Sequence, residues 1–152
     1  MEEPLVKIHY WLYPISWIYG MGVRLRNKLF DWGYYRSKSF DVPVVCVGNL
    51  AVGGTGKTPH TEYLIKLLQQ TGTNVAMLSR GYKRKSKGYV LATEETDVKR
   101  IGDEPYQIKT KFPAIRVAVD ENRCHGIEQL MKLGHPKVDV VLLDDAYQHR
   151  YV

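Results

Sequence analysis

Short apolar runs alternate with amphipathic segments throughout residues 41–152. The runs at 42–47, 75–78, 115–119 and 138–143 are rich in valine, isoleucine and leucine, which is typical of strands buried on both faces of a parallel sheet. Between them, two longer segments carry apolar residues at helical spacing. They are residues 57–70, followed by Gly72 as an expected C-terminal cap, and residues 121–133. The alternation of strands and helices predicts an α/β fold with a mainly parallel sheet flanked by helices.

Two weaker segments complete this pattern. Residues 88–92 favour an extra or edge strand. Pro105 is expected to open a short helix that ends near Lys111, because proline is tolerated in the first helical turn.

Residues 1–40 differ in character and predict a separate aromatic helical arm. All three tryptophans, Trp11, Trp17 and Trp32, lie there together with several tyrosines and basic residues. The most apolar stretch, 5–21, is too polar to span a bilayer, which needs about 20 mainly apolar residues. Its acidic start is unlike a signal peptide. Aromatic and basic side chains suit contact with a membrane surface, and packing on the body as an ordinary helix is the alternative.

Composition and charge narrow the class of protein. With 44% hydrophobic and 25% charged residues, the 152-residue chain is unlike disordered or low-complexity proteins. Two cysteines, Cys46 and Cys124, are too few for a disulfide framework and favour a reducing, cytoplasmic compartment. A formal charge of +6 suits an anionic partner, but it does not choose among nucleotide, nucleic acid and acidic lipid.

The strongest chemical signal is a glycine-rich segment between the first strand and the first helix. It fits the phosphate-loop pattern G-x-x-x-x-G-K-[ST], except that alanine replaces the first glycine. Its backbone N–H groups and the start of the following helix would cradle phosphate oxygens. The lysine would reach the β- and γ-phosphates, and the threonine hydroxyl would bind Mg²⁺. The predicted nucleotide-binding residues are Ala51, Val52, Gly53, Gly54, Thr55, Gly56, Lys57 and Thr58.

A second signal is the acidic pair Asp144 and Asp145, which follows the apolar run 138–143. In a phosphate-loop enzyme, such a strand brings a carboxylate to the edge of the sheet beside Thr58 and Mg²⁺. A solvated loop after a core strand is the alternative, and the loop motif favours the metal-binding interpretation. Which carboxylate lies nearer the metal stays open.

Further polar residues follow other strands. Arg80 ends the second strand and opens a run to Lys87 that contains five basic residues and no acid. That run is either a phosphate clamp or a solvated basic loop. The expected substrate-binding residues are Arg80, Asp120, Arg123, Gln148 and His149. For Asp120 and Arg123, a helix cap and a surface arginine are the alternatives.

Asp103 precedes the helix expected at Pro105 and has two interpretations. It could cap that helix, or its carboxylate could accept a proton from an attacking hydroxyl. Spacing alone favours the cap. His125 is expected to be an ordinary residue on a helix surface.

Four motifs in sequence order resemble those of tetraacyldisaccharide 4'-kinase, the lipid A biosynthesis kinase family of Gram-negative bacteria. They are the segment 47–59, Ser79-Arg80-Gly81-Tyr82, Gly102-Asp103-Glu104-Pro105 and Asp144-Asp145-Ala146-Tyr147-Gln148-His149-Arg150. The resemblance covers essentially the whole chain, the aromatic arm included. Ala146-Tyr147 departs from the family pattern, which has glycine and then an apolar residue.

The resemblance implies a phosphate-loop NTPase type of fold and a kinase that uses ATP and Mg²⁺. Such kinases transfer the γ-phosphate to the 4'-hydroxyl of a tetra-acylated glucosamine disaccharide 1-phosphate, as peripheral proteins at the cytoplasmic face of the inner membrane. It also implies that Asp103 is the general base, and that Asp144 and Asp145 serve Mg²⁺ or its shell. Lys57 is the second expected catalytic residue, because its charge would stabilise the negative charge that develops during transfer.

Family members are considerably longer than this chain. We therefore expect residues 41–152 to be a kinase domain that is incomplete at its C-terminus, and the chain to be an N-terminal portion with doubtful activity alone. The histidine thought to partner the catalytic carboxylate in the family would lie beyond Val152.

Two other classes of protein remain open. A GTPase would carry an N-K-x-D motif after the loop, and none occurs. A non-catalytic nucleotide- or nucleic-acid-binding module would account for the positive charge. The basic residues, however, lack the aromatic-interleaved pattern of a nucleic-acid groove. We therefore expect no nucleic-acid partner and no obligate protein partner.

Overall fold

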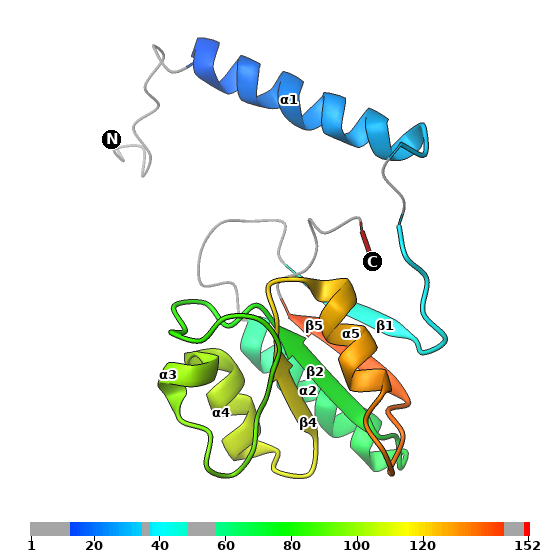
Figure 1. Ribbon diagram of the computed structural model, residues 1–152, viewed down its shortest axis with the longest axis vertical. Helices are drawn as coiled ribbons and strands as arrows, with labels where there is room; N and C mark the ends of the chain where they lie inside the picture. Colours follow the sequence, from blue (N-terminus) through cyan, green and yellow to red (C-terminus); the bar gives the residue numbers. More distant parts are fainter. Residues whose placement is uncertain (1–12, 35–36, 49–56, 145–150) are drawn as a thin grey trace, which may run out of the picture. The chain divides into compact units, whose positions relative to one another are not determined.

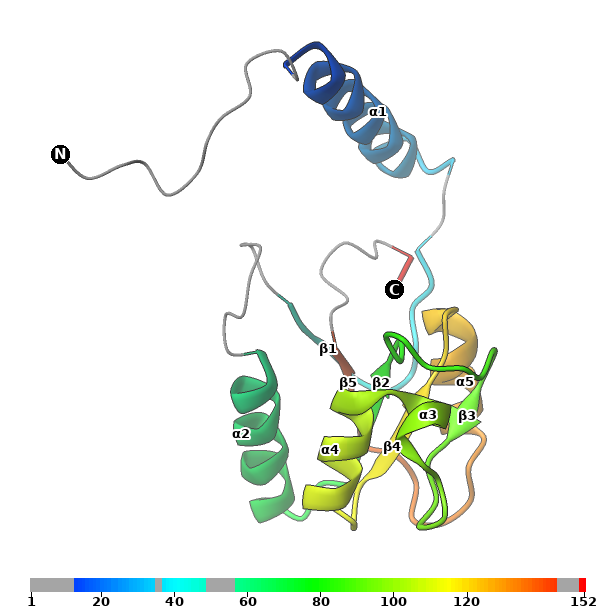
Figure 2. The ribbon, with the colours of Figure 1, turned by 90° about the vertical axis from the view of Figure 1, so that its left-hand side faces the viewer.

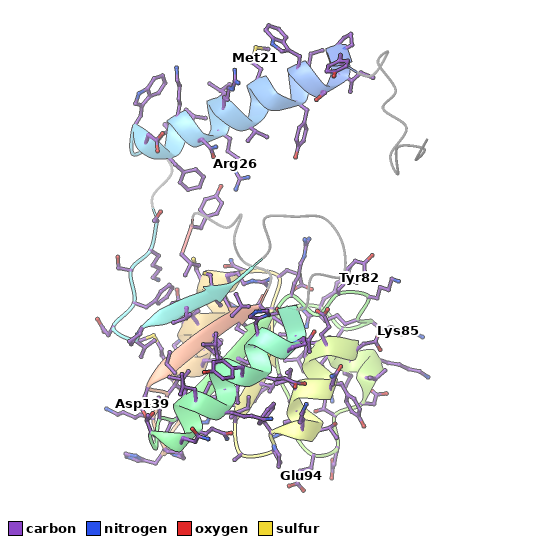
Figure 3. All side chains as sticks on the ribbon, turned by 180° about the vertical axis from the view of Figure 1, so that it is seen from behind. Met21, Arg26, Tyr82, Lys85, Glu94 and Asp139 are labelled. Carbon is purple, nitrogen blue, oxygen red and sulfur yellow. The ribbon has the colours of Figure 1, made fainter. Side chains whose placement is uncertain are left out.

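The computed structural model describes residues 13–34, 37–48, 57–144 and 151–152, and it divides the chain into two compact units, Met1–Ser37 and Lys38–Val152. In the first unit, helix α1 (Tyr13–Asp31) carries Pro14 in its first turn, where a missing N–H costs little. Most of its large apolar side chains are exposed, and Met21 and Arg26 project from different sides of it (Figure 3). Among the described residues, no helix is long and apolar enough to cross a membrane.

The second unit is built on one sheet with the strand order β1-β5-β2-β4-β3 (Figure 1). The first four of these strands pair in parallel, and β3 pairs with β4 in the antiparallel direction. The strands are β1 (Val44–Val47), β2 (Val75–Ser79), β3 (Val90–Leu91), β4 (Arg116–Val119) and β5 (Val140–Asp144). The mainly parallel sheet and the edge strand near residues 88–92 are both confirmed.

Helices cover both faces of this sheet, so the body has three layers (Figures 1 and 2). The chain passes from β1 to β2 and then to β4 with α2 (Lys57–Gln70), α3 (Val98–Ile101) and α4 (Asp103–Lys111) on one face. It then turns back from β4 to β5 with α5 (Arg123–Met131) on the opposite face. Crossovers of constant hand require this change of face when the direction reverses.

Alternating side chains of the strands form two apolar cores. On one face, Met77 and Leu142 pack in a cluster with Ile65 of α2 and Ile108 of α4. On the other, residues of the same strands that point the opposite way pack with Ile127 and Leu130 of α5. Because both faces are covered, β2 and β5 are buried at every residue, as the continuous apolar runs predict.

The elements expected from the sequence are present, with differences at their ends. Helix α2 has the expected bounds, and Gly72 follows it at φ +75° while Thr73 donates its N–H to the Leu68 carbonyl. Pro105 does not open α4. That helix begins at Asp103, so the proline is its third residue, where a missing N–H is still tolerated.

Candidate active site

The parallel strands bring several predicted site residues to one edge of the sheet. Val47 at the end of β1 is paired with Asp144 at the end of β5, and Ser79 at the end of β2 is paired with Val119 in β4. Arg80 and Asp120 directly follow β2 and β4, so they lie at this same edge. In α/β sheets, ligands bind outside these carboxyl ends.

The predicted phosphate loop leaves this edge from β1 and returns into α2. Its residues 49–56 lie outside the described residues, and so do the motif residues 145–150. Predictions for Ala51 to Gly56, Asp145, Gln148 and His149 therefore stay predictions. Lys57 and Thr58 are the first two residues of α2. The N-terminus of this helix, with its partial positive charge, is therefore directly connected to the loop, as phosphate binding requires.

Asp144 is buried and lies on the α2 side of the sheet. Val140 and Leu142 belong to the core on that side, and strand alternation directs Asp144 to it as well. Among the described residues, no group of three or more His, Cys, Asp or Glu side chains could hold a metal on its own. A Mg²⁺ site made of one or two carboxylates, a hydroxyl and substrate phosphates does not need such a group. The donors of Asp144 and Thr58 fit that kind of site.

Arg123 joins the ends of two strands. It is the first residue of α5 and is buried, not on the surface. Its guanidinium donates to the Asp120 carbonyl at 2.7 Å and to the Asp144 carbonyl at 3.3 Å. It therefore fixes the backbone at Asp144 from the α5 side. Partial burial raises the pKa of the Cys46 thiol, and the positive charge of Arg123 offsets part of that increase.

Asp120 is also buried, and it does not cap α5. Asn122 is the cap, and its side chain accepts a hydrogen bond from the His125 N–H. One Asp120 carboxylate oxygen accepts the Asn122 N–H, and the other lies 2.6 Å from His125 Nδ1. The His125 ring is exposed on α5, as expected, but this contact orients it. Sequence spacing gave no sign of the pair.

Two glycines bring the Arg80-Gly81-Tyr82 and Gly102-Asp103 motifs into contact. Gly102 has φ +91°, and a β-carbon placed on it would lie 2.8 Å from the Tyr82 carbonyl oxygen. Gly81 has φ +69°, and a β-carbon there would lie 2.8 Å from the Ile101 carbonyl oxygen. Any side chain at either position would therefore separate the two backbones, which explains glycine at both.

Asp103 opens α4 directly after this contact. Gly102 is the cap residue and Asp103 is the first helical residue, so the expectation of an Asp103 cap is wrong. The helix does not need the side chain of Asp103 as its cap, and this side chain is exposed. Tyr82 and Lys85 lie at the end of the body where β1 and β5 finish, opposite Asp139 (Figure 3). Since Gly102 contacts Tyr82, Asp103 is at that same end, where Asp144 closes β5.

The basic run 80–87 is not uniformly solvated. Arg80 is exposed, as either interpretation expects, but the Arg84 side chain is buried and forms an ion pair with Glu121. The sequence pattern did not single out either member of this pair. A run of like charges does not show which of its residues is buried against an acidic partner, since that partner lies 37 positions away along the chain.

Comparison with known proteins adds an independent line of evidence. The family model described as LpxK, tetraacyldisaccharide-1-P 4'-kinase, matches residues 8–152. Over the whole chain, 69% of residues are identical to a tetraacyldisaccharide 4'-kinase of Bacteroides thetaiotaomicron and 53% to one of Porphyromonas gingivalis. A crystal structure of LpxK from Aquifex aeolicus in complex with ATP superposes with a TM-score of 0.81 at 41% identity, covering 92% of this chain.

These relatives are longer than this chain. The chain spans 40% of the Bacteroides thetaiotaomicron protein, 42% of the Porphyromonas gingivalis protein and 44% of the Aquifex aeolicus chain.

Proposed function

This chain belongs to the tetraacyldisaccharide-1-P 4'-kinase family, and we propose that it forms the ATP-binding and phosphoryl-transfer part of a lipid A kinase. The acceptor would be the 4'-hydroxyl of a tetra-acylated disaccharide 1-phosphate. The observation that carries the proposal is the pairing of Val47 with Asp144. This register supports the placement of a metal-binding carboxylate beside the start of the phosphate loop.

The nucleotide and its metal would be bound through different contacts by Lys57, Thr58 and Asp144. Lys57 would contact the β- and γ-phosphates, and the oxygens of Thr58, Asp144 and Asp145 would hold Mg²⁺. Mg²⁺, when bound, neutralises charge on the phosphates. Arg123 supports this arrangement because it donates to the Asp144 carbonyl and holds the strand end in place.

Asp103 would accept the proton of the attacking sugar hydroxyl. Its place at the start of α4 supports this role, because its side chain is exposed at the carboxyl edge and does not serve as the cap of the helix. General-base catalysis of this kind contributes about 10²–10⁴-fold to the rate. Phosphoryl transfer otherwise depends on positioning and charge neutralisation, which the loop and Lys57 would supply.

The first unit would bring the kinase to its lipid substrate at the cytoplasmic face of the inner membrane. Helix α1 exposes the large side chains of Trp17, Tyr19 and Leu25, and it carries Arg24 and Lys28. Aromatic rings favour the membrane–water interface, and each basic residue near an anionic surface contributes about 1 kcal/mol. These features support peripheral membrane contact by residues 1–40.

The test is a phosphate-transfer assay on a chimera in which these 152 residues replace the matching segment of the Bacteroides thetaiotaomicron relative. With Mg²⁺ and γ-labelled ATP, we expect label on the acylated disaccharide 1-phosphate. The matched control is an acceptor without the 4'-hydroxyl, which should stay unlabelled. Equal labelling of both acceptors, or transfer from GTP in preference to ATP, would contradict the proposal.

A further inference from the structure

Arg84 is a buried cation that organises the segment between β2 and β3. Only 3% of its side chain is exposed. Its guanidinium donates to the Glu121 carboxylate at 2.6 Å, to the Gly88 carbonyl at 2.8 Å and to the Ser86 hydroxyl at 3.2 Å. The same Glu121 carboxylate accepts the Gly88 N–H at 2.9 Å. Glu121 and Arg84 therefore fold residues 84–88 into a closed loop tied to the end of β4.

This closed loop is attached to the helix that leads into Asp103. The Lys85 N–H donates to the Lys99 carbonyl at 2.8 Å, and the Ser86 hydroxyl donates to the Arg100 carbonyl. Two consecutive carbonyls near the C-terminal end of α3 thus receive hydrogen bonds from the loop, which satisfies groups that a helix end leaves without intrahelical partners. The backbone that precedes Gly102 and Asp103 is held from this side.

The two glycines extend the attachment to the general base itself. A β-carbon on Gly81 would lie 2.5 Å from Arg84 Cδ, so the Arg84 side chain packs directly on Gly81. Gly81 in turn lies against the Ile101 carbonyl, and Gly102 lies against the Tyr82 carbonyl. An unbroken series of contacts therefore leads from Glu121 through Arg84 and Gly81 to the residue before Asp103.

We propose that the Arg84–Glu121 ion pair is the positioning element of the kinase, which holds the Asp103 carboxylate and Arg80 in place at the carboxyl edge of the sheet. The proposal rests on the proposed function, because it assigns the purpose of this ion pair to the geometry of the general base. Arg84 and Glu121 themselves act through the backbone and do not touch the reactants. A displacement of about 1 Å at a reacting group can cost about 10²-fold in rate, so a small loosening of the loop would be visible in turnover.

A second ion pair supplies a matched control. Lys38 and Glu128 also join two distant segments of the body at 2.5 Å, with 53% and 35% of their side chains exposed. This pair connects residue 38 to Glu128 of α5, and so involves neither residues 84–88 nor α3. Its removal reports the general effect of losing one ion pair, which is small for exposed groups.

The kinetic experiment compares Glu121→Gln, Arg84→Lys and Glu128→Gln in the chimera described above. For the first two variants we expect kcat to fall at least about tenfold, while the KM for ATP stays within about twofold. Arg84→Lys keeps the charge but lacks the several N–H donors of the guanidinium. A fall in kcat for this variant would therefore show that the hydrogen-bond geometry of Arg84, and not its charge alone, supports turnover. Glu128→Gln should keep the parent kcat.

Hydrogen exchange in the 152-residue chain tests the same idea without turnover. Glu121→Gln should speed exchange in peptides that cover residues 81–88 and 99–106, and leave β2 and α5 unchanged. If the parent chimera transfers no phosphate, the proposed function fails, while faster exchange at 99–106 would still support the link between the loop and α4. A chimera that is active and keeps its kcat after Glu121→Gln, or unchanged exchange at 99–106, would overturn the positioning role.

Discussion

Val47 and Asp144 are register partners at the carboxyl ends of two neighbouring parallel strands. Val47 is followed by the predicted phosphate loop, and Asp144 begins the acidic motif. Their separation is therefore fixed by backbone pairing in the sheet and does not depend on the conformation of either loop. A strand pair gives a more rigid support for a metal site than loops alone.

Asp144→Asn should weaken Mg²⁺-dependent ATP binding. The amide keeps the size of the side chain but removes the negative charge that attracts the cation, and we expect an affinity loss of about 10–100-fold. Calorimetric titration of ATP with Mg²⁺ and with EDTA measures it. If the loss of ATP affinity relative to the parent is the same with Mg²⁺ as with EDTA, Asp144 serves the fold and not the metal.

Lys57→Ala should abolish phosphate transfer by the chimera while the fold stays intact. Lys57 begins α2, where its ammonium would neutralise charge on the transferred phosphate, and loss of such a group costs about 10²–10³-fold or more. Circular dichroism and thermal unfolding of the 152-residue chain provide the control for folding. Near-parental turnover by a folded variant would remove Lys57 from the mechanism.

Asp103→Asn should lower kcat far more than it lowers ATP affinity. Asparagine preserves the shape of the first residue of α4 but cannot accept the hydroxyl proton, so we expect about a 10²–10⁴-fold decrease in kcat. Initial rates at saturating acceptor, with ATP affinity measured separately, distinguish the two effects. A variant that loses affinity alone would identify Asp103 as a nucleotide contact instead of a base.

Three glycine-to-alanine substitutions should lower the free energy of unfolding by different amounts, according to the backbone φ angle and the space available for a β-carbon. Gly102→Ala combines φ +91° with a contact of 2.8 Å to the Tyr82 carbonyl, and it should cost about 1–3 kcal/mol or more. Gly88→Ala has φ +69° but open space, so it should cost less. Gly134→Ala has neither problem and should be near neutral. Urea unfolding of the chain gives the ranking, and equal values for the three would show that the Gly81–Gly102 contact is not tight.

The Arg84–Glu121 pair should make the free energy of unfolding depend on pH in the acidic range. Partial burial opposes ionisation of Glu121, but hydrogen bonds from its own backbone, Arg84 and Gly88 outweigh this and hold its pKa below the ordinary 4.5. A lowered folded pKa gives stability that is present above pH 4.5 and is lost as the pH falls through the folded value. The difference in unfolding free energy between parent and Glu121→Gln should therefore shrink from neutral pH to pH about 4. A difference that is constant or grows in acid would contradict this linkage.

The elements of the fold were predictable because each has a strong local signature. Strands β2 and β5 are continuous apolar runs, and α2 follows a glycine-rich loop with its apolar stripe at helical spacing. Alternation of strands and helices then implied a parallel sheet. Their order did not follow from the sequence, since nothing local to β5 says that it inserts between β1 and β2. The error at Pro105 arose because proline is tolerated throughout the first helical turn, and not only at its first position.

For the candidate site, the residues with local motifs were predictable and their partners were not. Asp144 could be predicted as a site residue because it ends an apolar run that is typical of a buried strand. Arg84 lies in a run that was expected to be a phosphate clamp or a solvated basic loop, and Arg123 was expected to bind substrate or to lie on the surface. Both side chains are buried. A buried arginine is identified by the groups that surround it. For Arg123 these include the carbonyl of Asp144 in β5 and that of Asp120, which follows β4, and for Arg84 a carboxylate from a distant segment.

The insertion of β5 between β1 and β2 also dictates an order of assembly. Strand β1 does not pair with β2, because β5 lies between them and pairs with both. During synthesis on the ribosome, residues 44–47 therefore cannot pair with their partner strand until about a hundred further residues have emerged. Until then the glycine-rich segment has a helix on one side and an undocked strand on the other. ATP should thus be a ligand of the nascent chain only after Asp144 has left the exit tunnel.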